Sequence, residues 1–158
     1  MNFIEFIERE RMKVSTKARY GLRAVMELGL NYTKGPLLLK EIAKRQEISL
    51  KYLDHIFSLL KKIGIVKSVG KGKGYILSRP PSQIRIWEII EVLEETNLLD
   101  CLTTPNLCKR AQFCAARNLW SNLAGSLRKS LENISLEDLL REQEDILKRE
   151  NKNAMYYI

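Results

Sequence analysis

The sequence is poor in the residues that build enzyme centres. It has one histidine and three cysteines in 158 residues. No acidic pair lies near the histidine, and neither a nucleophile motif nor a phosphate-binding loop of Walker spacing is present. No apolar run approaches the roughly 20 residues of a membrane helix. The N-terminal letters NFIEFIERER mix acidic and basic residues, unlike a signal peptide. We therefore expect a cytoplasmic protein with no catalytic residues and no membrane partner.

Positive charge is concentrated in the first half of the chain. Residues 12–75 hold 14 Lys and Arg against 4 Asp and Glu, a net charge of +10, whereas the other residues hold 13 against 15, a net charge of −2. A uniformly basic protein would not show this asymmetry. Binding to nucleic acid, which releases counterions from the phosphates, would use such a basic half.

Residues 39–77 have the pattern of two helices joined by a tight turn and followed by a hairpin. Gln46 and Glu47 are expected to form the turn, and Ser49 is a good N-cap for the second helix. Apolar residues recur in that helix at three- and four-residue spacing, which predicts one buried face. The residues of this face are Leu53, Ile56, Leu60 and Ile63.

The opposite face of the second helix is polar and carries Lys51, Tyr52, Asp54 and His55. A helix with a buried back and a hydrogen-bonding front can lie in the DNA major groove. The alternative is a small core helix pair with no ligand. Because charge and pattern agree, we predict a helix-turn-helix that binds double-stranded DNA.

Two short strands, 65–69 and 75–77, flank a loop of alternating glycine and lysine. Lys71 and Lys73 are the cations of this loop. A loop of this kind beside a helix-turn-helix is typical of a wing that contacts phosphates or the minor groove. Upstream, Lys17, Arg19 and Arg23 lie near the start of a helix predicted over 15–33, where they could hold phosphates or form a solvated face.

The expected fold is mainly α: a winged helix-turn-helix with a small β-hairpin wing and a long C-terminal dimerisation helix. The apolar stripe of the helix over 115–134, which includes Trp120 and Leu123, has little other apolar sequence to cover it, so we predict a homodimer. Ser135 and Asp138 resemble a capping box that starts the last helix. The predicted divisions are an N-terminal extension (1–11), the winged domain (12–81), a connecting helix and cysteine loop (82–114), the dimerisation and C-terminal helices (115–148) and a tail (149–158).

The three cysteines, Cys101, Cys108 and Cys114, have the spacing C-x6-C-x5-C. Thiolates bind soft metals and iron–sulfur clusters, and nearby cations such as Arg110 would favour the ionised form. The spacing matches neither a zinc ribbon nor a ferredoxin run, and ordinary reduced thiols remain an alternative. A fourth ligand could come from Glu94, Glu95, Asp100 or a partner subunit.

Several motifs occur in an order that resembles the Rrf-two family of bacterial regulators, the IscR, NsrR and CymR type. They are MKVSTKARYGLRAV, EIAKRQEISLKYLDHIFSLLKKIGIVKSVGKGKGY, the three cysteines, NLWS and ISLEDLL. The resemblance covers about residues 12–143 and is closest to the IscR-like iron–sulfur regulators. It implies a homodimeric winged-helix regulator of promoter DNA with an iron–sulfur cluster on the three cysteines.

The same resemblance implies roles for individual residues. Ser49, Lys51, Tyr52, Asp54 and His55 fall at base- and phosphate-reading positions, with Asp54 matching an acidic residue that can accept from cytosine. The wing is one residue shorter than in the family, so Lys71 or Lys73 must replace its arginine. Arg117 occupies the position of the histidine ligand of IscR-type proteins, and Arg19 occupies the position of the aspartate ligand of NsrR-type proteins. The resemblance therefore allows either a 2Fe–2S or a 4Fe–4S cluster.

The sequence therefore favours a repressor whose promoter binding is controlled by an iron–sulfur cluster that senses iron–sulfur, redox or nitric oxide status. The alternative is a cluster-free regulator of cysteine metabolism, controlled by thiol oxidation or by a partner protein.

Overall fold

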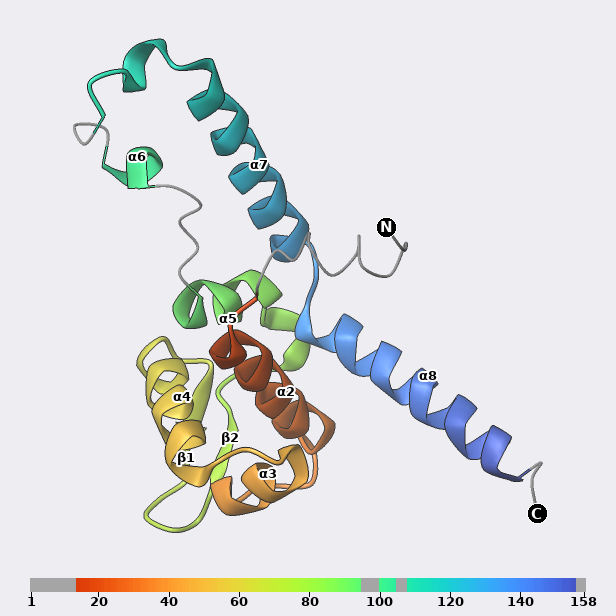
Figure 1. The fold of residues 1–158 in the computed structure, drawn as a ribbon. Helices are drawn as coiled ribbons and strands as arrows, with labels where there is room; N and C mark the ends of the chain where they lie inside the picture. The colour runs from red at the N-terminus through yellow and green to blue at the C-terminus, as the bar shows by residue number, and fades with distance from the viewer. Residues whose placement is uncertain (1–13, 95–99, 105–107, 156–158) are drawn as a thin grey trace, which may run out of the picture.

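The computed structural model describes residues 14–94, 100–104 and 108–155. A helical domain with a small hairpin occupies one end of the molecule, and two long helices extend away from it in different directions (Figure 1). The elements are α2 (Thr16–Leu30), α3 (Leu39–Gln46), α4 (Leu50–Lys62), β1 (Val66–Ser68), β2 (Tyr75–Leu77), η1 (Pro81–Gln83), α5 (Ile86–Leu93), α6 (Asp100–Thr103), η3 (Ala111–Phe113), α7 (Ala115–Glu132) and α8 (Leu136–Met155).

The core of the domain forms where α2, α3, α4 and α5 meet. The predicted helix over 15–33 is α2, and Ser15 caps it by accepting a hydrogen bond from the N–H of Ala18, 3.1 Å. Its buried side chains contact the apolar faces of α4 and α5. Gly21 lets α5 approach closely, because a Cβ there would collide with the side chain of Leu93. These contacts fix α4 against the rest of the domain.

The helix-turn-helix follows the sequence pattern with one difference. Glu47 adopts a left-handed conformation, φ 55°, at the end of α3, and Ile48 is buried behind the turn. Leu53, Ile56 and Leu60 are fully buried as predicted, but Ile63 is 44% exposed. The helix ends at Lys62, so Ile63 is its C-cap and leaves the buried face. Phe57, which the predicted stripe omitted, is fully buried.

The hairpin pairs β1 and β2 antiparallel, with Val66 opposite Leu77 and Ser68 opposite Tyr75. The first strand is shorter than the predicted 65–69. Tyr75 also exchanges two backbone hydrogen bonds with Leu37, so the chain entering α3 flanks the other side of β2. The hairpin is therefore fastened to the helix-turn-helix.

The junction between the end of α7 and the start of α8 lies beside the start of α5. The N–H of Ile86 donates to the carbonyl of Ile134, 3.0 Å, and the N–H of Leu136 donates to that of Ile84, 2.8 Å. Ser135 and Asp138 form the predicted capping box of α8. The helix then continues to Met155, through part of the segment predicted as a tail.

Residues 1–11 and Glu95 lie outside the described residues. Within the described ranges, no helix combines the length and the apolar character that crossing a bilayer requires.

Candidate nucleic-acid interface

The second helix of the helix-turn-helix, α4, presents a polar face to solvent. Ser49 caps it by accepting a hydrogen bond from the N–H of Tyr52, 3.3 Å. Lys51, Asp54 and His55 are exposed, as a surface that reads bases would need. The burial of the opposite face fixes the direction in which these side chains point.

Tyr52 differs from its polar neighbours because its ring is partly buried against α2. It packs edge-on against Tyr20, with 6.3 Å between ring centroids. The guanidinium groups of Arg19 and Arg23 lie 5.9 and 5.8 Å from the Tyr20 ring. An aromatic pair flanked by two cations thus joins the start of α2 to α4.

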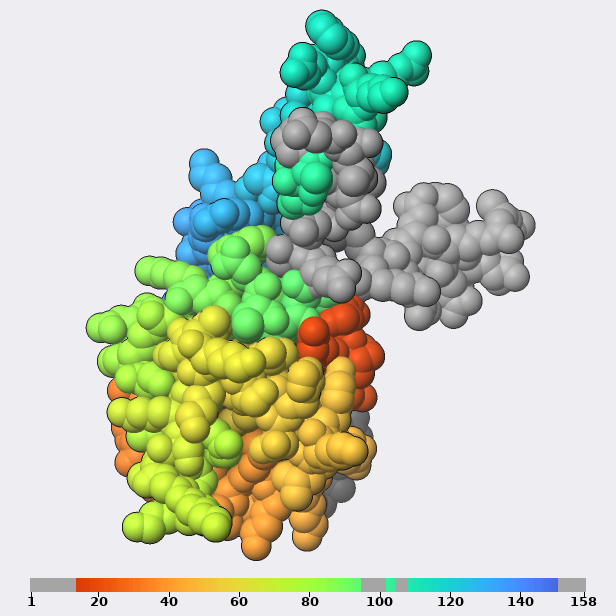
Figure 2. Space-filling view, turned by 90° about the vertical axis from the view of Figure 1, so that its left-hand side faces the viewer, coloured from red at the N-terminus to blue at the C-terminus, as the bar shows by residue number. Residues whose placement is uncertain are grey.

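The wing loop projects at the lower edge of the domain in Figure 2, below α4. Gly70, Gly72 and Gly74 all have positive φ, which explains the repeated glycine in this loop. Lys71 and Lys73 are both exposed. The loop therefore carries two cations away from the core, in keeping with the predicted wing.

A groove of about 870 Å³ separates the N-terminal halves of α3 and α4 from the wing. Lys40, Lys51 and Lys71 line it together with Asp54, and leucines and Tyr75 form its apolar part. The structure thus brings together Lys51, Asp54 and Lys71 from two of the predicted contact elements. Lys40 was not among the predicted residues of this surface, because its position in α3 gives no sign that the wing folds toward it.

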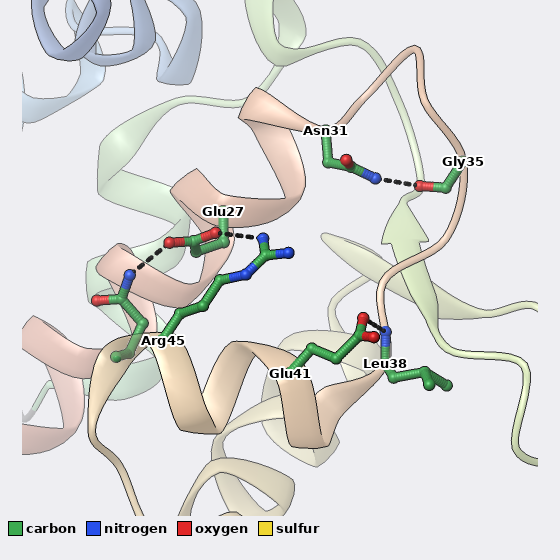
Figure 3. Close-up of polar contacts among 7 residues, drawn as sticks. Glu27, Asn31, Gly35, Leu38, Glu41 and Arg45 are labelled. Atoms are coloured by element: carbon green, nitrogen blue, oxygen red, sulfur yellow. Dashed lines mark hydrogen bonds and ion pairs between the residues drawn. The ribbon is translucent and has the colours of Figure 1, made fainter. Parts of the chain in front are cut away.

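A polar network holds α2 to the turn of the helix-turn-helix. Glu27 accepts from Arg45, 3.2 Å, and from Gln46, 2.6 Å (Figure 3). Gln46 in turn accepts from the Nε of Arg23, 2.7 Å. Arg23, which the sequence offered as a phosphate contact, is thus engaged within the protein. Lys17 is half-buried and Arg19 is exposed.

The ends of α2 and α3 are held by further contacts in the same region. Asn31 donates to the carbonyl of Gly35, 2.7 Å, and Glu41 accepts from the N–H of Leu38, 3.4 Å (Figure 3). The first bond closes the turn after α2, and the second caps the start of α3. Lys40 in the first turn of α3 is consequently held on a fixed backbone.

The cysteine segment lies on the far side of α5 from the wing (Figure 1). Cys101 falls within α6, and its side chain is not among the described ones. Cys108 is exposed, and Cys114 is half-buried at the N-cap of α7; both are free thiols. Within the described part of the chain, no three His, Cys, Asp or Glu side chains form a ready-made metal site.

The donor chemistry of this segment nevertheless fits a soft metal centre. Cys108 and Cys114 are unbridged, and cysteine sulfur is a ligand that iron and other soft metals accept. Cys114 also stands at the positive end of the α7 dipole.

The long helix α7 has no buried residue. Leu119 is 61% exposed, Leu123 44% and Leu127 39%, and Phe113 just before the helix is 90% exposed. The C-terminal part of the helix contacts α5, where the guanidinium of Arg128 lies 5.5 Å from the Trp87 ring. Among the described residues, therefore, an apolar face of α7 stays exposed.

Comparison with known proteins agrees with this geometry. The family model described as "Rrf2: Iron-dependent Transcriptional regulator" matches residues 14–142. The chain is 36% identical to the HTH-type transcriptional regulator IscR of Cronobacter sakazakii, over 90% of each protein. It is 37% identical to IscR of Escherichia coli K12, over 84% of this chain and 83% of that protein.

Solved structures give the same result. T. potens IscR superposes with a TM-score of 0.70 at 37% identity, covering 85% of this chain and 90% of that one. CymR, the global cysteine regulator of B. subtilis, superposes with a TM-score of 0.66 at 35% identity, covering 83% and 98%. The winged-helix fold predicted from the sequence is confirmed.

Proposed function

Because the chain belongs to the Rrf2 family of transcriptional regulators, we propose that it binds promoter DNA as a homodimer and represses transcription under the control of its cysteine segment. The groove between α4 and the wing carries this proposal. It combines a polar helix face, a cationic loop and three lysines on one surface. This is the chemistry that a DNA backbone and its adjoining grooves require.

In the proposed complex α4 lies in the major groove. Ser49 and Lys51 at its start contact phosphates or base edges, and Asp54 accepts from a cytosine amino group. His55 is exposed one position further along the helix. Tyr52 both contacts DNA with its exposed edge and holds α4 against Tyr20.

The remaining contacts fix the register of the protein on the duplex. Lys71 and Lys73 of the wing reach phosphates or the minor groove, and Lys17 and Arg19 hold the backbone from the start of α2. Lys40 joins them, since it lines the same groove as Lys51 and Lys71. Phosphate contacts of this kind supply affinity, whereas sequence preference comes from α4.

The homodimer is supported by the uncovered face of α7. Leu119, Trp120, Leu123 and Leu127 are all at least 39% exposed. A second copy packing on this face would bury them and would place two α4 helices side by side, as a pseudo-palindromic operator requires.

Cys101, Cys108 and Cys114 would hold the iron–sulfur cluster, either 2Fe–2S or 4Fe–4S. Such a cluster, when bound, supplies a redox- and nitric-oxide-sensitive centre. The chain's own part is to present the sulfur ligands and to connect them to α5 on one side and to α7 on the other. A change in this segment could thereby alter the spacing of the two α4 helices.

The likeness to CymR supports a second form of regulation. Free thiols at Cys108 and Cys114 could respond to oxidation, or a partner protein could act on the dimer, without any cluster. DNA binding that is indifferent to iron but sensitive to peroxide would favour this form.

Selection of genomic fragments by the purified full chain under anaerobic conditions tests the proposal. We expect enrichment of promoter fragments that share a pseudo-palindromic sequence. After reconstitution with iron and sulfide, we expect visible absorbance that Cys108→Ala and Cys114→Ala each abolish. A colourless protein that still selects promoters would favour the cluster-free form, and failure to select any fragment would refute DNA regulation.

A further inference from the structure

The N-terminus of α2 is capped by residues that lie far apart in the chain. The side chain of Ser15 accepts from the N–H of Ala18, 3.1 Å, and the N–H of Ser15 donates to the carboxylate of Glu94, 2.9 Å. In an ordinary capping box the second acceptor stands three residues after the cap. That position is Ala18, whose side chain has no acceptor. Glu94, 79 residues further along the chain, provides the acceptor instead.

Three other helices, α3, α5 and α8, take this carboxylate from their own first turn. Glu41 accepts from the cap residue of α3, Glu88 from that of α5 and Asp138 from that of α8. The first turn of α2 contains no acidic residue. The local sequence therefore offers no negative charge to the positive end of the α2 dipole, and Glu94 places one there.

The two partners of this hydrogen bond connect separate parts of the molecule. Ser15 precedes the turn of α2 that carries Lys17 and Arg19, the proposed phosphate contacts. Glu94 is the C-cap of α5, and its own N–H donates to the carbonyl of Ile90, 2.8 Å. Cys101 follows seven residues later in the sequence. The bond thus joins the entrance of the cysteine segment to the phosphate-binding end of α2.

We infer that Glu94 is a positioning residue for DNA binding, which holds the first turn of α2 in place and makes it responsive to changes in the cysteine segment. The inference rests on the proposed function. Glu94 acts through Ser15 rather than by touching DNA, since a carboxylate is repelled by phosphates. Its removal therefore weakens binding only because Lys17 and Arg19 lose their fixed position.

The test compares Glu94→Ala with Glu91→Ala in the full chain. Both substitutions remove one negative charge from α5, but only the first removes the acceptor of the Ser15 N–H. By NMR, we expect hydrogen exchange at the Ser15 amide to accelerate in Glu94→Ala alone. For the duplex that the wild-type chain selects, we expect affinity about three- to tenfold lower in Glu94→Ala than in Glu91→Ala.

Two further readouts separate positioning from general loss of stability. The slope of log affinity against log salt should become shallower by up to about two in Glu94→Ala, because two cations are displaced.

Alkylation of the cysteines with iodoacetamide should change the rate of hydrogen exchange at the Ser15 amide in Glu91→Ala but not in Glu94→Ala. Glu94→Gln, which keeps an acceptor oxygen, should give the same changes at smaller amplitude, and it serves if the alanine variant does not fold.

Equal duplex affinities and equal salt slopes for the Glu94 and Glu91 variants would overturn the positioning role, as would unchanged exchange at Ser15. An equal response to alkylation would overturn the link to the cysteine segment. A third outcome separates this inference from the proposed function. If neither the wild-type chain nor any variant bound a duplex, but exchange at Ser15 still rose in Glu94→Ala, the hydrogen bond between Ser15 and Glu94 would be supported. The proposed DNA binding, and with it the positioning role of Glu94, would be refuted.

Discussion

Leu37 and Tyr75 exchange two backbone hydrogen bonds, 3.0 and 2.8 Å, that fasten the wing to the chain entering α3. Gly74 makes this approach possible, because a Cβ there would collide with the carbonyl of Leu37. Its φ of +93° also disfavours any other residue. The relative position of wing and helix-turn-helix thus depends on one glycine.

Gly74→Ala should lower the free energy of unfolding by roughly 2–3 kcal/mol, since it adds a backbone collision to left-handed strain. Gly72→Ala is the matched control, because Gly72 has φ +73° but open space around it. It should cost only about 1 kcal/mol. Chemical denaturation of both variants measures the difference, and equal losses would show that the Leu37 contact is unimportant.

The hydrogen bond between Arg23 and Gln46 should contribute to stability as a coupled pair. In a double-mutant cycle of Arg23→Ala and Gln46→Ala, we expect a coupling energy of about 0.5–1 kcal/mol, because the bond is exposed to solvent and water competes for both groups. Arg19→Ala with Gln46→Ala is the control cycle and should show no coupling. Strict additivity in the first cycle would argue that Arg23 is free to bind phosphate.

The exposed face of α7 should determine the oligomeric state. Leu123→Asp should raise the dimer dissociation constant more than tenfold, because a carboxylate would be buried in the interface. Ser121→Asp introduces the same charge on another side of the helix and should leave the dimer intact. Sedimentation velocity at several concentrations distinguishes them. A monomeric wild-type chain, or equal effects of the two variants, would contradict the proposed interface.

Asp138 should make stability depend on pH. Hydrogen bonds from Ser135 lower the pKa of Asp138 below its ordinary value. A carboxylate whose pKa is lower in the folded state stabilises the fold above its unfolded pKa of about 4, and this contribution is lost as pH falls through the folded pKa. Asp138→Asn should therefore flatten the fall in unfolding free energy on acidification. An unchanged profile would show that the cap carries no net stabilisation.

The sequence was informative wherever local chemistry decides the structure. Ser49 caps α4, the spacing of Leu53 and Leu60 gives its buried face, and alternating glycines form the wing loop. Each of these depends on residues a few positions apart. The same pattern failed at Ile63, because one residue beyond the helix end no longer follows the helical period.

What the sequence could not show depends on residues brought together by the fold. The pairing of Leu37 with Tyr75 and of Ser15 with Glu94 leaves no trace in spacing. Lys40 enters the groove only because the wing folds toward it. The extension of α8 to Met155 was missed for another reason: Glu, Lys and Arg favour a helix by their intrinsic propensity, without the apolar spacing that marks a buried face.

The most direct test of the whole account is the salt dependence of binding to the selected promoter duplex. Lys40→Ala, Lys51→Ala and Lys71→Ala should each weaken binding several-fold and make the slope of log affinity against log salt shallower by about one. Lys148→Ala removes the same charge from α8, outside the groove, and should change neither. If the three groove variants bind with the affinity and slope of the wild-type chain, the groove between α4 and the wing is not where DNA lies.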